Sequence, residues 1–484
     1  MHEKELPRSV VRVTTPAPMT IGELRKTPHS YKPIKTEIRD NLVGRLRSGR
    51  PSLPGIVGFE ATVVPEVERA LLAGHDLVLL GERGQGKTRL IRTLTGLLDE
   101  WTPVVEGCEI NDHPYLPACR RCQAIIAEQG DLTPVAWRHR DERYGEKLAT
   151  PDTSVGDLIG DVDPIKVAEG RTLGDPETVH YGLVPRTNRG IFSINELPDL
   201  AERIQVSLLN VLEERDIQVR GYQLRLPLDL LLVASANPED YTNRGRIITP
   251  LKDRFGAEVR THYPLNLDDE MVLIAQEALV LWDGDGAYDQ PLVPPHLLEA
   301  VARFTREVRE APQVDARSGV SARFAIAAIE TLAASAVRRA ALTGEPAAVA
   351  RVCDLPAVVP ASRGKVEFED TEEGRELDVL EHLLRRAVAA TFRARLAGVD
   401  LSGLQHTFDA GATVATGDLV PADELLRQLG TIPGLAALLE RLGVDEGIEN
   451  PGLVAAAVEF AMEGLHLNRR LAKEQVDGRT LYGG

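Results

Sequence analysis

The sequence is short of aromatic residues, cysteine and positive charge, and it has no long apolar run. Phe, Trp and Tyr make up only 4% of its 484 residues, so a core must be built mainly from aliphatic side chains. The formal net charge of −17 argues against a nucleic-acid partner. Four cysteines are too few for a disulfide framework. No apolar stretch approaches the roughly 20 residues of a membrane span, and no secretory hydrophobic region opens the chain. We therefore predict a soluble, cytoplasmic protein.

The length and the charge distribution predict several domains. Residues 1–50 carry 11 Lys and Arg against 5 Asp and Glu. They predict a basic N-terminal arm, either solvated or strapped onto a neighbouring domain. The other predicted parts are an α/β core at 51–265 with an irregular, cysteine-containing insertion at 105–150, a helical lid at 266–350, a linker at 351–375 and a helical C-terminal region at 376–484.

Short, wholly apolar runs predict strands buried on both faces of a parallel sheet. The strand candidates are 77–80, 191–194, 228–234 and 257–261. Apolar residues at helical spacing predict helices at 34–46, 63–72, 89–98, 202–214, 268–281, 296–310, 321–342 and 376–396, and 218–226 is a candidate hairpin. Strands alternating with helices, then helices alone, predict an α/β core followed by an all-helical lid.

A glycine-rich turn follows the first of these strands. It reads Gly81-Glu82-Arg83-Gly84-Gln85-Gly86-Lys87-Thr88, the spacing of a phosphate-binding loop. Backbone N–H groups of such a turn surround phosphate oxygens, and the helix that follows adds the positive end of its dipole. Lys87 can reach the β- and γ-phosphates, and the Thr88 hydroxyl can bind Mg²⁺. The turn therefore predicts ATP and Mg²⁺ as cofactors. A ligand-free glycine turn is the alternative, and the position between an apolar strand and a helix argues against it.

The strand at 191–194 ends in Asn195-Glu196. An acidic pair at a strand end is what a Walker B element needs, since the first acid helps to hold Mg²⁺ and the second polarises the attacking water. Asn195 is neutral, so its pull on Mg²⁺ is weaker, whereas Glu196 keeps the charge that positions water. A solvated glutamate is the alternative, and the phosphate loop upstream makes it the weaker interpretation.

Two further residues are candidates for the same site. Asn237, at the end of the third strand, can hydrogen-bond the γ-phosphate or the catalytic water, although Asn-Pro also favours an ordinary turn. Arg254 can act as an arginine finger at a subunit edge. Arg244 and Arg246 compete for that role, and a surface salt bridge is the alternative.

A last arginine lies at the start of a predicted lid helix. Arg323 can contact bound nucleotide and transmit its state to the lid. Arg317 is the alternative residue for this role, and a solvated arginine at a helix start is the alternative interpretation.

The order of these motifs resembles that of the AAA+ ATPases of the magnesium-chelatase I-subunit and MoxR group. The motifs are Ile56-Val57-Gly58, the phosphate loop, the acidic strand end, Asn237-Pro238-Glu239, Asp253-Arg254-Phe255-Gly256 and Ser321-x-Arg323, and the match covers about residues 54–345. The hairpin at 218–226 looks like one of this group's insertions. The resemblance implies a homo-oligomeric ring, usually a hexamer, that hydrolyses ATP–Mg at subunit interfaces and remodels a partner protein. That partner commonly contains a von Willebrand A domain.

The resemblance also implies roles for single residues. Ile56 and Val57 would line the adenine pocket, and Lys87, Thr88 and Glu196 would act within their own subunit. Arg254 would act on the neighbouring subunit, and Arg323 would be the second sensor.

Asn195 departs from the family pattern, which has Asp there. This departure favours a rival function, namely a nucleotide-gated binding or scaffold protein with negligible hydrolysis. A third function, an AAA+ transcriptional activator, would want a Gly-Ala-Phe-Thr-Gly-Ala loop, which the sequence lacks.

Three of the cysteines lie close together in the insertion. Cys108, Cys119 and Cys122, with His113 between them, are a candidate set of structural zinc ligands. His139 or Cys353 could supply the fourth ligand instead. The alternative is that reduced cysteines are simply buried as small apolar residues.

Overall fold

The computed structural model describes two compact units. It describes residues 15–162, 179–213, 217–219, 222–224, 226–238, 246–278, 290–315, 319–430, 432–444, 449–476 and 479–483. The first unit comprises Met1–Gly81 and Gly86–Thr261, and the second comprises Glu82–Gln85 and His262–Gly484. Among the described residues, no helix is long and apolar enough to cross a membrane.

The first unit is built on a five-stranded sheet in the order β12-β2-β11-β8-β5. The strands are β2 (Leu77–Leu80), β5 (Tyr144–Leu148), β8 (Ile191–Asn195), β11 (Leu231–Ala236) and β12 (Ala257–Arg260), and every neighbouring pair is parallel. All residues of β2, β8 and β11 are buried, as their apolar composition predicts. The predicted parallel α/β core is therefore confirmed.

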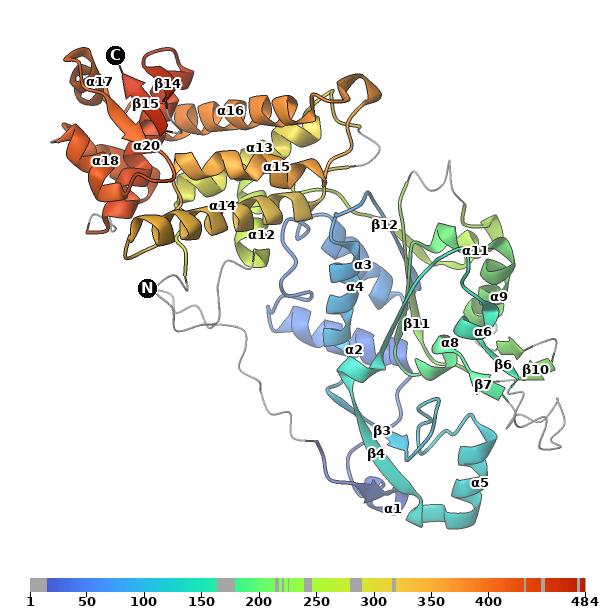
Figure 1. Cartoon of the computed structure of the whole chain (residues 1–484). Helices are drawn as coiled ribbons and strands as arrows, with labels where there is room; N and C mark the ends of the chain where they lie inside the picture. The colour runs from blue at the N-terminus through green and yellow to red at the C-terminus, as the bar shows by residue number, and fades with distance from the viewer. Residues whose placement is uncertain are drawn as a thin grey trace. The chain divides into compact units, whose positions relative to one another are not determined.

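Helices cover both faces of this sheet (Figure 1). Helices α2 (Ile34–Arg47), α3 (Val63–Leu72) and α4 (Lys87–Thr93) bury their apolar sides in one hydrophobic cluster with alternate strand residues such as Leu77 and Val233. Helices α9 (Glu202–Glu213) and α11 (Thr249–Arg254) pack in a second cluster with the residues between, such as Val78 and Ala234. Because strand side chains alternate, β2, β8 and β11 each contribute to both layers.

Helix α2 belongs to the core although it lies in the basic N-terminal segment. Its Ile34, Ile38 and Leu42 are fully buried, and each such side chain contributes roughly 1.5–3 kcal/mol by leaving water. Its Glu37 accepts two hydrogen bonds, of 2.7 and 2.8 Å, from the guanidinium of Arg143, and both side chains are almost completely buried. This bidentate pair ties the segment to the residue that precedes β5.

The segment 105–150, predicted to be an irregular insertion, is largely regular. Strands β1 (Met19–Thr20), β4 (Pro134–His139) and β3 (Trp101–Val105) form an antiparallel sheet beside α1 (Ile21–Leu24), and α5 (Arg120–Gln129) joins β3 to β4. Moreover, β5 is the edge strand of the main sheet. The sequence of β5 carries no apolar run because an edge strand is only half-buried.

Shorter elements complete the first unit. They are α6 (Val155–Leu158), α8 (Leu183–Arg186), the 3₁₀ helices at Leu94–Leu97, Gly130–Leu132, Arg140–Arg143 and Leu197–Asp199, and the antiparallel pairs β6 (Gly160–Val162) with β7 (Val179–Tyr181) and β9 (Ile217–Val219) with β10 (Tyr222–Leu224). The last pair is the hairpin predicted at 218–226.

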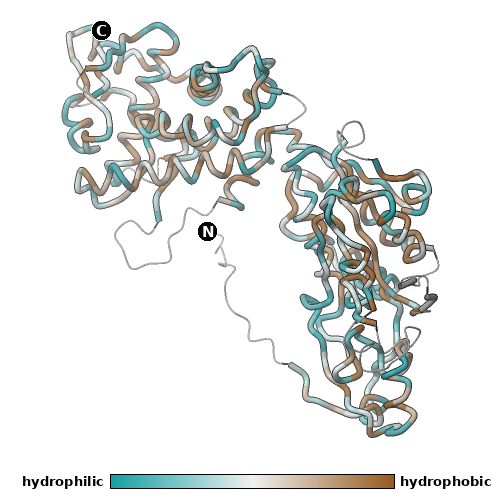
Figure 2. The backbone as a smooth tube through the Cα atoms, turned by 45° about the vertical axis from the view of Figure 1, so that its right-hand side comes forward, coloured by the Kyte–Doolittle hydropathy of each residue, from teal (hydrophilic) through white to brown (hydrophobic). Residues whose placement is uncertain are grey.

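The second unit is mainly helical. Its helices are α12 (Leu267–Glu277), α13 (Pro295–Glu310), α14 (Ala322–Thr343), α15 (Val358–Arg363), α16 (Glu376–Arg395), α17 (Ser402–Asp409), α18 (Ala422–Leu429), α19 (Leu435–Leu442) and α20 (Pro451–Leu467). Their apolar faces meet in one hydrophobic cluster, and Figure 2 shows apolar and polar stretches alternating along them, as amphipathic helices require. The predicted helices at 268–281, 296–310, 321–342 and 376–396 are confirmed over their described residues.

Two parts of this unit differ from the prediction. The linker expected at 351–375 contains a 3₁₀ helix at Val352–Ala357, α15 and a 3₁₀ turn at Asp370–Glu372. Its prolines and charged residues suggest an exposed linker. The Arg351 side chain is nevertheless completely buried and lies 3.4 Å from Glu459 of α20. The C-terminal region also contains a three-stranded antiparallel sheet of β13 (Val414–Thr416), β15 (Arg479–Gly483) and β14 (Ala472–Val476).

Candidate nucleotide-binding site

The glycine-rich turn connects β2, an interior strand of the main sheet, to α4. The backbone N–H of Gly81 donates to the carbonyl of Ala236 at 3.1 Å, which holds the start of the turn against the neighbouring strand β11. Gly84 and Gly86 both have φ of 74°, a left-handed conformation that side chains disfavour. Helix α4 then begins at Lys87, with Thr88 half-buried in its first turn. The turn thus has the strand–loop–helix setting of a phosphate-binding loop.

Three residues singled out in the sequence form a chain of hydrogen bonds beyond this turn. The buried Lys87 ammonium donates to the Asn237 side-chain oxygen at 2.8 Å and also to the carbonyl of Gly81. The Asn237 side-chain nitrogen donates to a carboxylate oxygen of Glu196 at 2.8 Å. The neutral amide of Asn237, directly after β11, therefore links the cation of Lys87, at the start of α4, to the anion of Glu196, directly after β8.

Glu196 has a backbone that few residues adopt. Its φ and ψ are 56° and 48°, the left-handed region that costs a non-glycine residue roughly 1–2 kcal/mol. Its backbone N–H donates to the Ser235 hydroxyl at 3.3 Å, which helps to hold this conformation. Such local strain clusters at functional sites, where it fixes the direction of a side chain.

Asn195 interacts with an acidic residue that the sequence interpretation did not select. Its side-chain nitrogen donates to Glu146 of β5 at 2.6 Å, and its side-chain oxygen accepts from the Ser235 hydroxyl at 3.3 Å. Glu146 also accepts from Arg92 of α4 and from the Tyr144 hydroxyl, each at 3.0 Å. The sequence gives little signal for this residue, because Tyr144-Gly-Glu-Lys-Leu has no alternation of apolar and polar residues that would predict a strand.

The tip of the turn, Glu82–Gln85, packs within the second unit. The carbonyl of Gly84 accepts from the backbone N–H of Ala322, the first residue of α14, at 3.4 Å, and the Tyr263 hydroxyl donates to the carbonyl of Arg83 at 2.8 Å. A Cβ atom on Gly84 would lie 1.9 Å from the Cβ of Ser321, so only glycine fits. Arg323, the predicted second sensor, is exposed in this first turn of α14.

The remaining predicted residues lie as follows. Ile56 and Val57 are half-buried in the loop before α3, and Ile56 packs against the hydrophobic cluster that contains β2. Arg254 ends α11, and its guanidinium donates to the carbonyl of Pro250 at 2.9 Å. Arg246 is exposed. The competitors Arg244 and Arg317, and Glu239 of the quoted motif, lie outside the described residues.

The three cysteines of the insertion gather with a carboxylate. The sulfur atoms of Cys108, Cys119 and Cys122 and an oxygen of Asp112 all lie within 4.8 Å of one another. Hydrogen bonds from Cys119 and Cys122 lower the pKa of the Cys108 thiol to about 3, and the bond with Cys108 raises the pKa of Cys119 to about 12.

The histidines proposed as ligands lie elsewhere. The Nε2 atom of His113 is 2.9 Å from Nε2 of His29, the two rings are stacked, and burial lowers the pKa of His113 to about 2. His139 packs edge-on against Trp101. Cys353 belongs to the second unit. The structure thus brings Asp112 to the three cysteines, and does not bring His113, His139 or Cys353 into that cluster.

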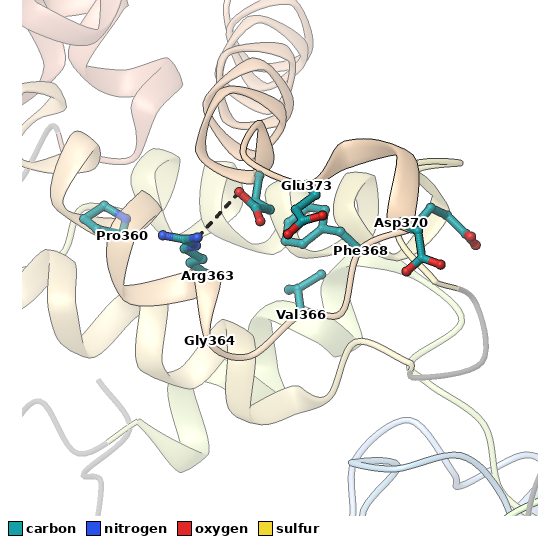
Figure 3. A pocket seen from close by; sticks show the side chains of 9 residues that line it. Pro360, Arg363, Gly364, Val366, Phe368, Asp370 and Glu373 are labelled. Carbon is teal, nitrogen blue, oxygen red and sulfur yellow. Dashed lines mark ion pairs between the residues drawn. The ribbon is translucent and has the colours of Figure 1, made fainter.

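A separate surface pocket in the second unit does not suit a nucleotide. It has a volume of about 500 Å³ and is lined by residues between Pro360 and Glu376. Arg363 is paired with Glu376 at 3.6 Å, and Asp370 and Glu373 also line it (Figure 3). Acidic side chains outnumber the single arginine, so the lining would repel a triphosphate.

Parts of the chain are similar to known proteins. The model of the Sigma-54 interaction domain matches residues 171–254. The chain is 29% identical over 200 residues to the magnesium-chelatase subunit ChlI of Guillardia theta, covering 38% of this chain and 50% of that protein. It is 30% identical over 232 residues to the magnesium-chelatase 38 kDa subunit of Rhodobacter capsulatus, covering 46% and 60%.

Its homologues are magnesium-chelatase subunits. The resemblance to this group of AAA+ ATPases, inferred above from the motif order, is thereby confirmed. The chain spans only 50 to 60% of the length of these magnesium-chelatase relatives.

Solved structures give alignments of low score. The complex between the magnesium-chelatase subunits BchI and BchD aligns with a TM-score of 0.34 at 24% identity, covering 66% of this chain and 96% of that one. A putative ATPase from Cytophaga hutchinsonii aligns with a TM-score of 0.30 at 14% identity, covering 73% and 96%.

Proposed function

We propose that this magnesium-chelatase-like chain hydrolyses ATP–Mg in a homo-oligomeric ring and uses the energy to remodel a partner protein. The observation that carries the proposal is the chain of hydrogen bonds from Lys87 through Asn237 to Glu196. It links the three kinds of group that phosphoryl transfer to water needs: a cation for the phosphates, a polar group at the γ-phosphate and a carboxylate for the water.

The phosphates would be bound by the turn at Gly81–Thr88. The left-handed glycines, Gly84 and Gly86, let the backbone approach a ligand that a Cβ atom would keep away. The first turn of α4 adds its N-terminal dipole. Lys87, which now bonds Asn237 and Gly81, would exchange these partners for phosphate oxygens.

The water would be activated by Glu196. Its left-handed backbone directs the carboxylate towards Asn237, so the two side chains are already oriented. Asn237 would hold the γ-phosphate or the water. The carboxylate of Glu196 would accept a hydrogen bond from the attacking water. This arrangement costs no reorganisation during the reaction.

Mg²⁺ fits a site made of Thr88 and the groups at Asn195. When bound, the ion neutralises charge that develops on the phosphates. Oxygen ligands suit it, and the hydroxyl of Thr88 and the side-chain oxygen of Asn195 offer them. Glu146, 2.6 Å from Asn195, supplies the negative charge that an Asp at position 195 would carry. We therefore assign to Glu146 the electrostatic part of the Walker B role.

The ring, the arginine finger and the partner rest on the family resemblance. Arg254 would reach the γ-phosphate of the next subunit, and Arg323 would act as the second sensor in the site of its own subunit. Ile56 and Val57 would line the adenine pocket. A hexamer and a partner with a von Willebrand A domain are the forms that this group implies.

The rival function is a nucleotide-gated scaffold with negligible hydrolysis. The observation that favours it is the neutral Asn195, whose amide nitrogen is engaged by Glu146. The two functions differ in turnover but not in nucleotide binding.

Steady-state ATP hydrolysis separates the two functions. The assembled wild type should show Mg²⁺-dependent turnover, and Glu196→Gln should bind ATP while losing turnover by at least about 100-fold, the lower end for general base catalysis. Lys87→Ala is the binding control, because it should abolish nucleotide binding itself. Tight ATP binding without turnover in the wild type would support the scaffold instead, and tight binding by Lys87→Ala would refute the phosphate loop.

A further inference from the structure

The cluster at Cys108 lies in the first unit, where β3, the loop after it and the start of α5 meet. Cys108 follows Gly107, whose φ of 69° turns the chain out of β3. Cys119 is the N-cap of α5, and Cys122 lies in its first turn. Asp112 lies in the intervening loop, where its carbonyl accepts a hydrogen bond from Val105 of β3 at 2.9 Å. Two separate backbone segments thus bring four ligand atoms to one point.

Backbone donors are already directed at the sulfurs. The N–H of Asp112 donates to the sulfur of Cys108, and the N–H of Cys122 donates to the sulfur of Cys119, each at 3.3 Å. A neutral thiol is a weak acceptor, whereas a thiolate gains strongly from such donors. The N-terminal end of the α5 dipole favours negative charge at the same place.

Asp112 carries the observation that points most directly to a ligand. Its side chain is only 1% exposed. One carboxylate oxygen accepts from the backbone N–H of Cys119 at 2.8 Å, while the other is buried and has no hydrogen-bond partner among the described residues. A buried polar atom without a partner is costly, and a cation would satisfy it.

We propose that Cys108, Asp112, Cys119 and Cys122 bind a structural zinc ion. A tetrahedral ion with bonds of about 2.0–2.3 Å needs ligand atoms within about 4 Å of one another, which a cluster confined to 4.8 Å can provide with small side-chain rotations. The four ligands leave no open position, so the site is structural and not catalytic.

The spacing of the ligands supports this set. It comprises two short pairs, Cys108-x3-Asp112 and Cys119-x2-Cys122, and paired ligands two to four residues apart are typical of structural zinc sites. The sequence pattern of cysteines alone concealed the first pair, because its second member is a carboxylate.

The surrounding fold has a use for such an ion. Cys119 and Cys122 are buried members of the hydrophobic cluster that contains residues of β8, β11 and α9, and Cys108 packs against this cluster. Zinc would fix the start of α5 to the end of β3.

The test begins with the metal content of the full-length protein. Protein purified without chelators should contain zinc in a 1:1 ratio to the chain by elemental mass spectrometry. Cys119→Ser should lose it, whereas Cys353→Ser, which changes the one cysteine outside the cluster, should keep it. His113→Ala should also keep it, and a loss there would restore His113 as a ligand in place of Asp112.

Substitution by Co²⁺ tests Asp112 itself. The Co²⁺ form should show thiolate-to-metal charge-transfer bands of three sulfur ligands, and Asp112→Cys should strengthen them. Asp112→Asn should weaken zinc affinity by more than roughly 10-fold, the least that even an outer-shell partner usually costs. Rescue by Cys but not by Asn distinguishes a ligand from a residue that only holds Cys119 in place.

Two outcomes would overturn the proposal. One is protein without zinc that also takes up neither zinc nor Co²⁺ when fully reduced. The other is a disulfide that forms between two of the three cysteines when freshly reduced protein is exposed to air, as detected by thiol counting. In that case the stability of the protein would also be unchanged on adding zinc.

Discussion

The side-chain amide of Asn195 donates a 2.6 Å hydrogen bond to the carboxylate of Glu146 on the neighbouring strand. The register of the sheet sets this pair, because β5 and β8 run parallel with Glu146 beside Ser193. An aspartate at 195 would bring two carboxylates into contact. The neutral side chain of Asn195 is therefore accompanied by an acidic residue on the next strand.

This relationship predicts the effect of Asn195→Asp. Without Mg²⁺ the variant should unfold about 1–3 kcal/mol more easily, because one hydrogen bond is replaced by repulsion between carboxylates. Mg²⁺ should restore more stability to the variant than to the wild type. Urea unfolding with and without Mg²⁺ measures both effects. The double variant Asn195→Asp/Glu146→Gln should recover the loss, and equal stability of all three proteins would contradict the pairing.

Arg254 should be needed across a subunit boundary. Arg254→Ala should keep nucleotide binding but lose turnover by on the order of 10³-fold, as for other arginine fingers. Mixing it with Glu196→Gln subunits should restore activity, since head-to-tail interfaces can then combine an intact Glu196 with an intact Arg254. ATPase rates over a range of mixing ratios check this. If no ratio exceeds the activity of either variant alone, the shared site is refuted.

The Glu37–Arg143 pair should make the basic N-terminal segment indispensable to the first unit. Replacing only Arg143 by Met leaves a buried carboxylate without its partner, which typically costs about 3–5 kcal/mol. Chemical denaturation should show this loss. Glu37→Met/Arg143→Met should recover most of it, because apolar residues can replace a buried pair. As a surface control, Lys32→Met breaks the exposed pair with Asp40 and should change stability by less than about 1 kcal/mol.

His296 should make the second unit sensitive to acid. The ring is completely buried against Phe460, with ring centroids 4.8 Å apart, and burial lowers its pKa to about 3. Because the unfolded chain binds the proton near pH 6.5, stability is present above that pH. It is lost by about 1.4 kcal/mol per unit as the pH falls towards 3.

The measurement is urea unfolding of the full chain between pH 7 and 4, followed by hydrogen exchange in α13. His296→Phe should flatten the pH dependence of that helix, whereas the exposed His406→Phe should leave it unchanged. A wild-type slope that persists in His296→Phe would assign the acid sensitivity to other groups.

The sequence predicted those parts of the site that follow directly from local pattern. The apolar run at Leu77–Leu80 specifies a strand, and the glycine spacing from Gly81 to Thr88 specifies a loop. Each pattern is complete within a few consecutive residues. The partners of these elements are specified elsewhere. Glu146 lies on a half-buried edge strand whose mixed polar composition resembles that of a loop. Only the register of the sheet brings this residue to Asn195.

The same reason explains the other differences. Asp112 is an ordinary acidic residue until the fold buries it beside three sulfurs. The segment around Arg351 looked like a linker because its charges suggest solvent, yet this arginine is fully buried beside Glu459. The burial of a charged residue that is paired with another charge cannot be recognised from the sequence pattern around it.

The order of strands in the main sheet has a consequence for how the chain folds. Leu77 of the interior strand β2 lies beside Val233 on one side and Ala257 on the other, both far along the chain. Ribosomes add roughly 5–20 residues per second, so β2 must wait many seconds for its neighbours. During that time its apolar edges stay open to other chains, and pairing so distant in sequence is slow. The strand that leads into the phosphate loop is therefore where we expect chaperones to bind the nascent chain.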